Sequence, residues 1–527
     1  MRISTQQYFD TSSSKYQDNY SGVVKTQDQA SSGVRVQTAS DDPVAAAQLL
    51  MLQQQKDMLG QYNGNITTLQ NSLSNEESVL SSINTVLQTA SGLALQAGNL
   101  KLSDDDRKAI ASQVGALEDQ VLGLLNTKDS SGNYMFSGAK TDTPPYSRNT
   151  DGTYTYQGDE TPLSLQVSSN LTVAAGDTGK ALLESSSNTG RTQATLLPPA
   201  VNDGSIAISA GVVTSGTAYT NSFAGGQPYK LTFASSTQYS VTDNAGNDVT
   251  SEITGGGTFD STKEGASIVN LRGVRFDITL NLGSDVASGP PSDALVAGKA
   301  FTLESKPDTF SVSRSANNAS TAQLAGGQVT NQATYASTFP NSGAVIKFTS
   351  GTTYDVYAQP YTANSKSIAT GTMAAGATSI TTVGVTFAVS GTPGTGDQFS
   401  VGATSNRNMN ALDTLGQLRR ALLAPVDGNQ VAKNTLKDVL NTTVGNLANA
   451  SAQIDQVRGS IGARQNGLDV QSQENSSLSL ANTSTMSSLA NVDMGQAAID
   501  LTLQQTMLQA SQQAFVRISQ LSLFSRM

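Results

Sequence analysis

Residues 66–97 read ITTLQNSLSNEESVLSSINTVLQTASGLALQA, and this stretch decides the fold of the chain. Its apolar and small residues recur in alternating steps of three and four, with Glu76 as the only interruption. This spacing is a heptad seam, which predicts a long helix that packs against other helices. The seam positions are Ile66, Leu69, Leu73, Leu80, Ile83, Leu87, Ala90, Ala94 and Ala97.

The C-terminal end of the chain carries a second seam. Its mean step is about 3.7 residues, which favours a nearly straight or slightly right-handed bundle. Helices of this kind at both ends of a chain serve either to join the ends to each other or to join copies of the chain, and periodicity alone leaves both open. The positions are Ile499, Leu503, Met507, Ala510, Ala514, Ile518 and Leu521.

The composition disfavours several classes of function. The 527 residues include no Cys, His or Trp, so the common catalytic triads, thiol nucleophiles and His- or Cys-based metal sites are unavailable. Hydroxyl–lysine and paired-carboxylate chemistry remain possible, but we expect no enzyme, no cofactor and no metal. The net charge of −10 argues against nucleic acid as a partner, since no basic stripe could neutralise phosphates.

The chain also lacks membrane signals. No segment approaches the roughly 18 consecutive apolar residues of a membrane helix, so we expect no membrane insertion. The first residues, MRISTQQ, have no apolar region of the kind found in cleavable signal peptides.

Helix start signals mark the N-terminal region. Asp42 followed by Pro43 predicts a helix start with a cap and a proline at the first helical position. Ser103 followed by Asp104, Asp105 and Asp106 predicts another, because the hydroxyl caps free N–H groups and the carboxylates meet the positive end of the dipole. Asp129–Asn133 predicts the turn that ends this helix. Helical periodicity returns near Asn408, stops briefly at 424–428 and continues to the end.

The middle of the chain predicts β-structure. Between about 141 and 402, Thr, Ser, Gly, Val and Tyr dominate, polar and apolar residues alternate, and the turns are rich in glycine. An internal repeat relates two parts of it, although Thr/Ser-rich strands can also resemble each other by chance. Tyr219, Phe223, Phe233 and Tyr239 correspond to Tyr335, Phe339, Phe348 and Tyr354, Gly273–Phe276 to Gly384–Phe387, and Gly298 with Phe301 to Gly396 with Phe399.

These patterns predict an α+β multidomain protein. Its N- and C-terminal helices form an antiparallel helical bundle or coiled coil, with all-β domains inserted between them. The expected parts are a terminal assembly helix (1–40), an N-terminal helical core (41–141), a β linker region (142–204), a first β domain (205–305), a second, related β domain (325–402), a C-terminal helical core (408–489) and a terminal assembly helix (490–527). An isolated terminal helix with its seam exposed to water is marginal, so we expect both ends to be disordered in the monomer and to fold when they meet partner helices.

Long motifs at both ends resemble the bacterial flagellin superfamily. Residues 31–46, SSGVRVQTASDDPVAA, are similar to its N-terminal signature. The segments LSDDDR (102–107) and YMFSGAKTDTPPY (134–146) resemble the hook–filament junction members, and so do SLANVDM (488–494), QQ (504–505), LQAS (508–511) and SLF (522–524). The two terminal regions that carry these motifs make up about half of the chain, and flagellin itself is the nearest alternative.

The resemblance implies a structural protein of the flagellum. Family members are exported unfolded through the flagellar type III apparatus without a cleaved signal, and they assemble between hook-associated protein 1 and the filament. The implied partners are hook-associated protein 1, flagellin, copies of the chain itself and a flagellar export chaperone, and the implied location is extracellular. The second β domain departs from the family pattern.

We expect the subunit interface to lie at the two ends. The candidate residues are Ile3, Tyr8, Val23, Val24, Leu503, Ala510, Ala514, Phe515, Ile518 and Leu521. Alternative readings are a secreted adhesin with a helical stalk and β binding domains, and a flagellin filament subunit.

Other motifs have simpler explanations. Asp41 and Asp42 are better explained as helix caps than as an inter-subunit contact. The triple aspartate at 104–106 fits dipole pairing near Arg107 rather than cation binding, because three consecutive carboxylates cannot all face one ion on a helix. The segment 243–248 lacks the bidentate Glu of a calcium loop and predicts a β-turn, and the Gly-rich segment 391–396 lacks the context of a phosphate loop.

Overall fold

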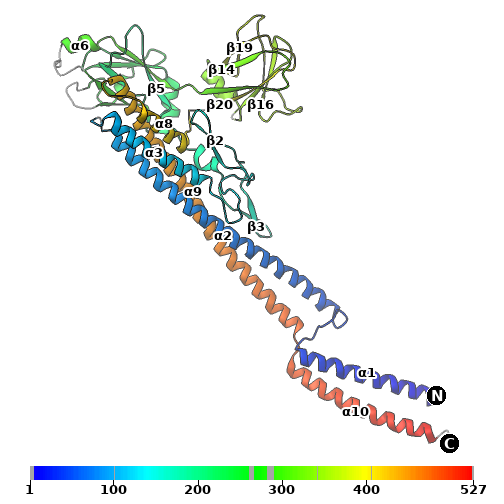
Figure 1. Ribbon diagram of the computed structural model, residues 1–527. Helices are drawn as coiled ribbons and strands as arrows, with labels where there is room; N and C mark the ends of the chain where they lie inside the picture. The colour runs from blue at the N-terminus through cyan, green and yellow to red at the C-terminus, as the bar shows by residue number, and fades with distance from the viewer. Residues whose placement is uncertain are drawn as a thin grey trace. The chain divides into compact units, whose positions relative to one another are not determined.

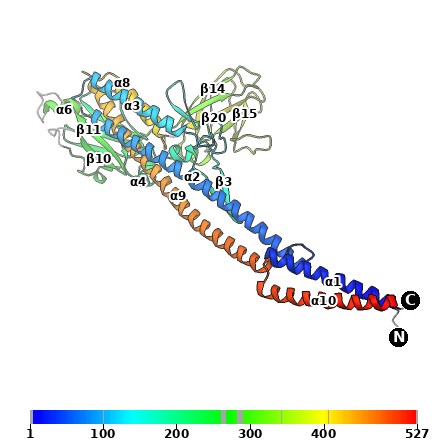
Figure 2. The ribbon, with the colours of Figure 1, turned by 60° about the horizontal axis from the view of Figure 1, so that its bottom comes forward.

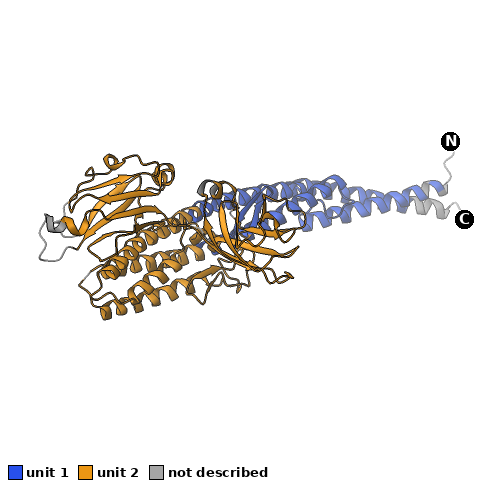
Figure 3. Cartoon of the chain, turned by 90° about the horizontal axis from the view of Figure 1, so that it is seen from above, with its two compact units in different colours: residues 1–74, 164–175, 461–527 blue, residues 75–163, 176–460 orange. Residues whose placement is uncertain are grey.

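The computed structural model describes residues 5–99, 101–259, 266–281, 290–340, 342–404 and 406–524. The chain divides into two compact units, which are described separately (Figure 3). Unit 1 comprises Met1–Ser74, Ser164–Ala175 and Ile461–Met527, and unit 2 comprises Asn75–Leu163 and Gly176–Ser460. Helices α2 (Pro43–Ala97) and α9 (Gln430–Ala490) each contribute to both units.

Unit 1 is built from antiparallel helix pairs. α1 (Thr5–Ser32) lies beside α10 (Met494–Phe524), as Figures 1 and 2 both show. The first part of α2 lies beside the last part of α9, with Gln70 donating to Asp469 at 2.7 Å and Asn482 donating to Gln55 at 3.4 Å. Strands β3 (Ser164–Ser168) and β4 (Leu171–Ala174) form a hairpin in this unit, and Asn475 of α9 donates to the Val167 carbonyl at 3.1 Å.

The heptad seam of residues 66–97 is buried along its whole length, with every predicted position at most 1% exposed. This confirms the helix–helix packing that the spacing predicts. Glu76, which interrupts the seam, is itself 2% exposed and accepts a hydrogen bond from the Asp177 backbone N–H at 3.0 Å. In unit 2 the seam is flanked by polar links to α9, where Arg458 pairs with Glu77 at 2.9 Å.

Unit 2 adds helices α3 (Asp104–Leu125) and α8 (Ala411–Leu423), which pack against each other. α3 begins as predicted: the Ser103 hydroxyl accepts from the Asp106 N–H, and the Asp106 carboxylate accepts from the Ser103 N–H. Arg107 is buried and pairs with Asp104 and with Asp427, the latter at 2.6 Å. In the triple aspartate, Asp106 therefore caps the helix start, and Asp104 contacts the loop before α9 together with Arg107.

Short elements connect the helices to the β domains. They are β1 (Tyr146–Arg148), β2 (Tyr154–Tyr156) and the irregular helical turn η1 (Lys180–Glu184). The β domains themselves contain further short helical turns: α4 (Gly216–Ala218), η2 (Tyr219–Phe223), α5 (Ala224–Gly226), η3 (Thr250–Glu252), α6 (Pro290–Val296) and α7 (Gln332–Thr338). Buried Glu118 of α3 joins β2 to α8, because it accepts from the Tyr154 hydroxyl at 2.7 Å and from Arg419 at 2.7 Å.

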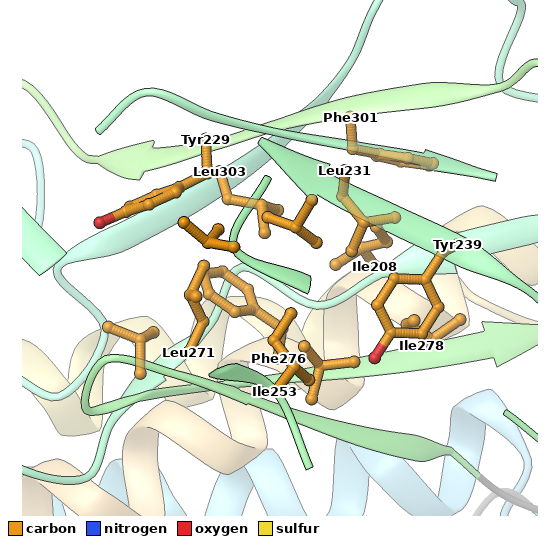
Figure 4. Close-up of a cluster of buried hydrophobic side chains, with 14 of the residues drawn as sticks. Ile208, Tyr229, Leu231, Tyr239, Ile253, Leu271, Phe276, Ile278, Phe301 and Leu303 are labelled. Carbon is orange, nitrogen blue, oxygen red and sulfur yellow. The ribbon is translucent and has the colours of Figure 1, made fainter. Parts of the chain in front are cut away.

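The first β domain is formed by two antiparallel sheets that enclose an aromatic core, shown in Figure 4. One sheet has the order β5-β12-β8-β9, and in the other β11 lies between β10 and β6, with β7 also paired to β11. Phe276, Leu231 and Leu303 are among its fully buried side chains. The strands are β5 (Thr192–Leu196), β6 (Ile206–Ile208), β7 (Val212–Val213), β8 (Tyr229–Phe233), β9 (Tyr239–Thr242), β10 (Ser267–Leu271), β11 (Val274–Leu280) and β12 (Ala300–Ser305).

The second β domain has the same plan, with sheets ordered β13-β20-β15-β16-β17 and β14-β19-β18 around its own core. β20 lies between β13 and β15 as β12 lies between β5 and β8. The strands are β13 (Thr309–Arg314), β14 (Gln323–Val329), β15 (Ala344–Phe348), β16 (Thr353–Ala358), β17 (Ala369–Thr372), β18 (Ser379–Thr382), β19 (Val385–Ser390) and β20 (Gln398–Thr404).

The two β domains repeat an unusual turn. Gly273 and Gly384 each follow a non-glycine residue with positive φ, namely Arg272 (φ 48°) and Val383 (φ 46°). Both glycine carbonyls accept backbone N–H bonds at 2.9 Å, from Thr214 in one domain and from Thr330 in the other. A shared strained turn with the same long-range partner supports the interpretation of a duplication.

The sheets extend beyond the predicted ranges 205–305 and 325–402. β5 comes from the predicted linker region but pairs with β12, and β13, which lies between the two ranges, pairs with β20. These partners lie about a hundred residues apart in sequence, so no local pattern assigns the edge strand to its sheet. The overall class, terminal helices with β-sheets inserted between them, is confirmed.

Candidate functional site

The signature segment 31–46 joins α1 to α2 and is held against the junction of α9 and α10. Val34 forms a β-bridge with Asn491, and the Val492 N–H donates to the Gly33 carbonyl at 3.0 Å. The Arg35 guanidinium donates to the Leu489 carbonyl at 2.8 Å. Motifs from the two ends of the sequence are therefore in direct contact, and this contact holds the α1–α2 connection against the α9–α10 connection.

Asp41 and Asp42 have different roles in this segment. Asp42 caps α2, because its carboxylate accepts a hydrogen bond from the Ala45 N–H at 3.0 Å. The pKa of Asp42 is lowered first by this hydrogen bond and second by the Arg35 guanidinium, which pairs with the same carboxylate. Asp41 does not cap α2; it pairs with Lys25 of α1 at 2.7 Å and accepts from the Thr38 N–H at 2.9 Å. The hydrogen bond from the Lys25 ammonium, which has the largest effect, and that from the Thr38 N–H hold the pKa of Asp41 well below its ordinary value.

Lys25 and Asp41 also line a surface cavity of about 320 Å³ between α1 and the signature segment. Tyr20 and Val24 form its apolar wall and are 54% and 40% exposed. Val24, a predicted interface residue, therefore faces solvent in the single chain.

The face that α10 presents to α1 combines polar and aromatic side chains. The Thr26 hydroxyl donates to Gln504 at 2.8 Å, Asn19 donates to Ser511 at 2.6 Å, and the ring centroids of Tyr16 and Phe515 lie 6.3 Å apart. Two predicted interface residues are engaged within the chain: Val23, which is 8% exposed, and Phe515, through this ring contact.

The predicted C-terminal seam lies on another face of α10. We define the α10 seam as Ile499, Leu503, Met507, Ala510 and Ala514. Its three large members are 63%, 52% and 48% exposed in that order, and both alanines are exposed. At about 100° per residue, the seam lies roughly a third of a turn away from the positions that face α1. The chain does not satisfy this seam internally.

The remaining predicted residues are outside what the structure describes. Ile3 lies outside the described residues. Tyr8, Ile518 and Leu521 lie within the helical bounds of α1 and α10, but their side chains are outside the described part.

Sequence reasoning missed an exposed apolar stripe on α2. We define the α2 stripe as Val44, Ala47, Met51 and Met58; Val44, Met51 and Met58 are 69%, 57% and 48% exposed, and Ala47 is exposed too. Its seven-residue spacing was available in the sequence. It was hidden because the same helix segment, AAAQLLMLQ, carries apolar residues on both faces, and only the fold shows which face is covered.

The described residues offer no obvious chemical centre. Within them, no three or more acidic side chains gather into a group that could hold a metal ion. Nor does any helix in this part of the chain combine the length and apolar character needed to cross a membrane.

Residues 3–141 match the family described as the bacterial flagellin N-terminal helical region. The flagellar hook-associated protein 3 of Salmonella typhimurium is 38% identical over 185 residues, which are 35% of this chain and 57% of that protein. The protein of the same name from Escherichia coli is 37% identical over 192 residues, with the same shares. The matched region thus spans 57% of the length of these curated relatives.

A crystal structure of a flagellar hook-associated protein-3 from Legionella pneumophila is also similar, with a TM-score of 0.48 and 22% identity over 83% of this chain and 98% of that chain. The resemblance that the terminal motifs indicated is therefore confirmed by the family and sequence matches. Residues 3–141 are thus similar to the bacterial flagellin N-terminal helical region, and part of the chain is similar to flagellar hook-associated protein 3.

Proposed function

We propose that this chain is a structural component of the bacterial flagellum that joins the hook to the filament by helical self-assembly through its terminal helices. The observation that carries the proposal is the α10 seam, an apolar helical face that remains exposed while α10 is already paired with α1. Large contiguous apolar patches on the surface of a soluble protein mark interaction sites. The matched relatives, both named flagellar hook-associated protein 3, support the same role.

The proposed partners are copies of the chain itself, hook-associated protein 1 on one side and flagellin on the other. A flagellar export chaperone would hold the ends before assembly, and the protein would be exported without a cleaved signal to an extracellular position. In this mechanism the α1–α10 contact sets the position of α10, and burial of the seam between copies drives association. The adhesin and filament-subunit alternatives are not favoured, because both matched relatives are named flagellar hook-associated protein 3.

The test is a matched pair of charge substitutions on α10. Ala514→Glu places a carboxylate in the proposed interface, where burial without a partner is costly. Gln512→Glu adds the same charge two residues away, about 200° around the helix, on an exposed position outside the seam. Each variant is expressed in a flagellated strain whose own junction protein has been deleted.

We expect Gln512→Glu to restore filaments as wild type does, and Ala514→Glu to be exported and folded but to leave hooks without filaments. Filament counts by electron microscopy and swimming halos provide the measurement. Normal filament growth with Ala514→Glu would show that the seam is not the assembly interface.

A further inference from the structure

The α2 stripe and the α10 seam match in length and character. The stripe runs over residues 44–58 and the seam over residues 499–514, which correspond to about 21 Å and about 22 Å of helix. Each spans four turns, contains methionine, and is exposed in the single chain. Methionine suits such contacts because its flexible side chain fits irregular apolar surfaces.

Their charge content is also compatible. Residues 43–58 contain one lysine and one aspartate, and residues 499–514 contain one aspartate. Glutamines lie beside both surfaces, at 48, 54 and 55 on α2 and at 509 and 513 on α10. Two helices with so few charges meet without strong like-charge repulsion, and their amide side chains can hydrogen-bond at the rim.

The geometry of assembly decides which surface meets which. A contact between two α10 seams is isologous, so it closes a dimer and leaves both α2 stripes in water. A contact between the α10 seam of one copy and the α2 stripe of another is heterologous, so every copy offers one surface and accepts at the other. Only the second arrangement covers both surfaces and continues into a ring or helix.

We propose that the α10 seam of one copy packs on the α2 stripe of the next copy, with Met507 near Met51. This inference rests on the proposed self-assembly and names the receiving surface for it. It assigns to the start of α2 a role in the contact between copies, in addition to its role in the intramolecular bundle.

The absence of cysteine from the chain makes cross-linking a direct test. Met51→Cys and Met507→Cys are made separately in the full-length protein, with a size tag on one of them. Both sites are about half exposed, so the smaller side chain leaves the core untouched. Gln505→Cys is the matched control, because it lies on α10 about 160° from Met507 and is exposed. Circular dichroism checks that each variant is folded.

The variants are mixed under polymerising conditions, sedimented to confirm assembly, and treated with a copper oxidant or a short bis-maleimide. We expect the Met51→Cys and Met507→Cys mixture to give a covalent dimer with one copy of each, at least tenfold above either variant alone and above the mixture with Gln505→Cys. A double variant carrying both cysteines should give a ladder of higher species.

Two results would overturn the inference while the proposed function stands: sedimenting assemblies with no mixed dimer, or cross-linking of Met507→Cys to itself as strong as in the mixture. Wild-type protein that fails to assemble, in solution and on hooks, would remove the proposed function and this inference with it.

Discussion

Asp438 of α9 is a partly buried carboxyl group whose ionisation should weaken unit 2 at neutral pH. Its side chain accepts from the Ala210 backbone N–H at 3.1 Å, at the loop between β6 and β7, and borders a small cavity with Asp277 and Lys437. Burial, the main cause, and the nearby Asp277 charge raise the pKa of Asp438 to about 6 from an ordinary value of 3.8. The Ala210 hydrogen bond and, more weakly, Lys437 and Lys306 oppose this rise.

The sign of the effect follows from this direction. Because the folded-state pKa lies above the unfolded value, the folded state favours the protonated form. Its stability therefore falls as pH rises from about 4 to about 6, and the penalty is fully present above that range. A shift of about two units corresponds to about 3 kcal/mol. Asp438→Asn keeps an acceptor for Ala210 and removes the charge, so it should stabilise unit 2 by up to about 3 kcal/mol at pH 7.

The assay is hydrogen exchange of peptides from β6 and β11 in wild type and Asp438→Asn between pH 4 and pH 8, which reads local opening free energy in a multidomain protein. The gap between the two proteins should shrink towards zero near pH 4. Glu474→Gln, an exposed site on the same helix, controls for net charge. A gap that is constant with pH, or a less stable variant at pH 7, would refute the reasoning.

Two further predictions concern packing. Gly384→Ala should destabilise the second β domain by more than about 2 kcal/mol, because the new Cβ would meet the Tyr335 backbone nitrogen at 2.4 Å at a residue with φ 79°. The control Gly376→Ala, at φ 77° in open space, should cost about 1 kcal/mol of unfolding free energy. Equal losses for the two variants in urea unfolding would contradict the steric argument. Ile83→Ala should cost about 2–5 kcal/mol because this seam residue is 0% exposed. Leu95→Ala, 66% exposed on the same helix, should cost less than about 0.5 kcal/mol, and thermal unfolding of the pair would show whether the seam is core.

The sequence alone determined the elements that depend on local chemistry. The heptad seam of residues 66–97, the capped starts at Asp42 and Ser103 and the interruption before α9 are all present as expected, because spacing and capping act within a few turns of chain. The duplicated aromatic pattern likewise pointed to two related β cores.

Only the tertiary structure decided which apolar faces are covered. Val23 and the α10 seam have similar apolar character in the sequence, yet Val23 is buried within the chain while Leu503 remains half exposed. The tertiary structure likewise decides that β5 and β13 join their sheets and that, of the two apolar faces of α2, the α2 stripe is the one left in solvent. Such choices depend on contacts between residues far apart in sequence, since periodicity identifies an apolar face but not the surface that buries it.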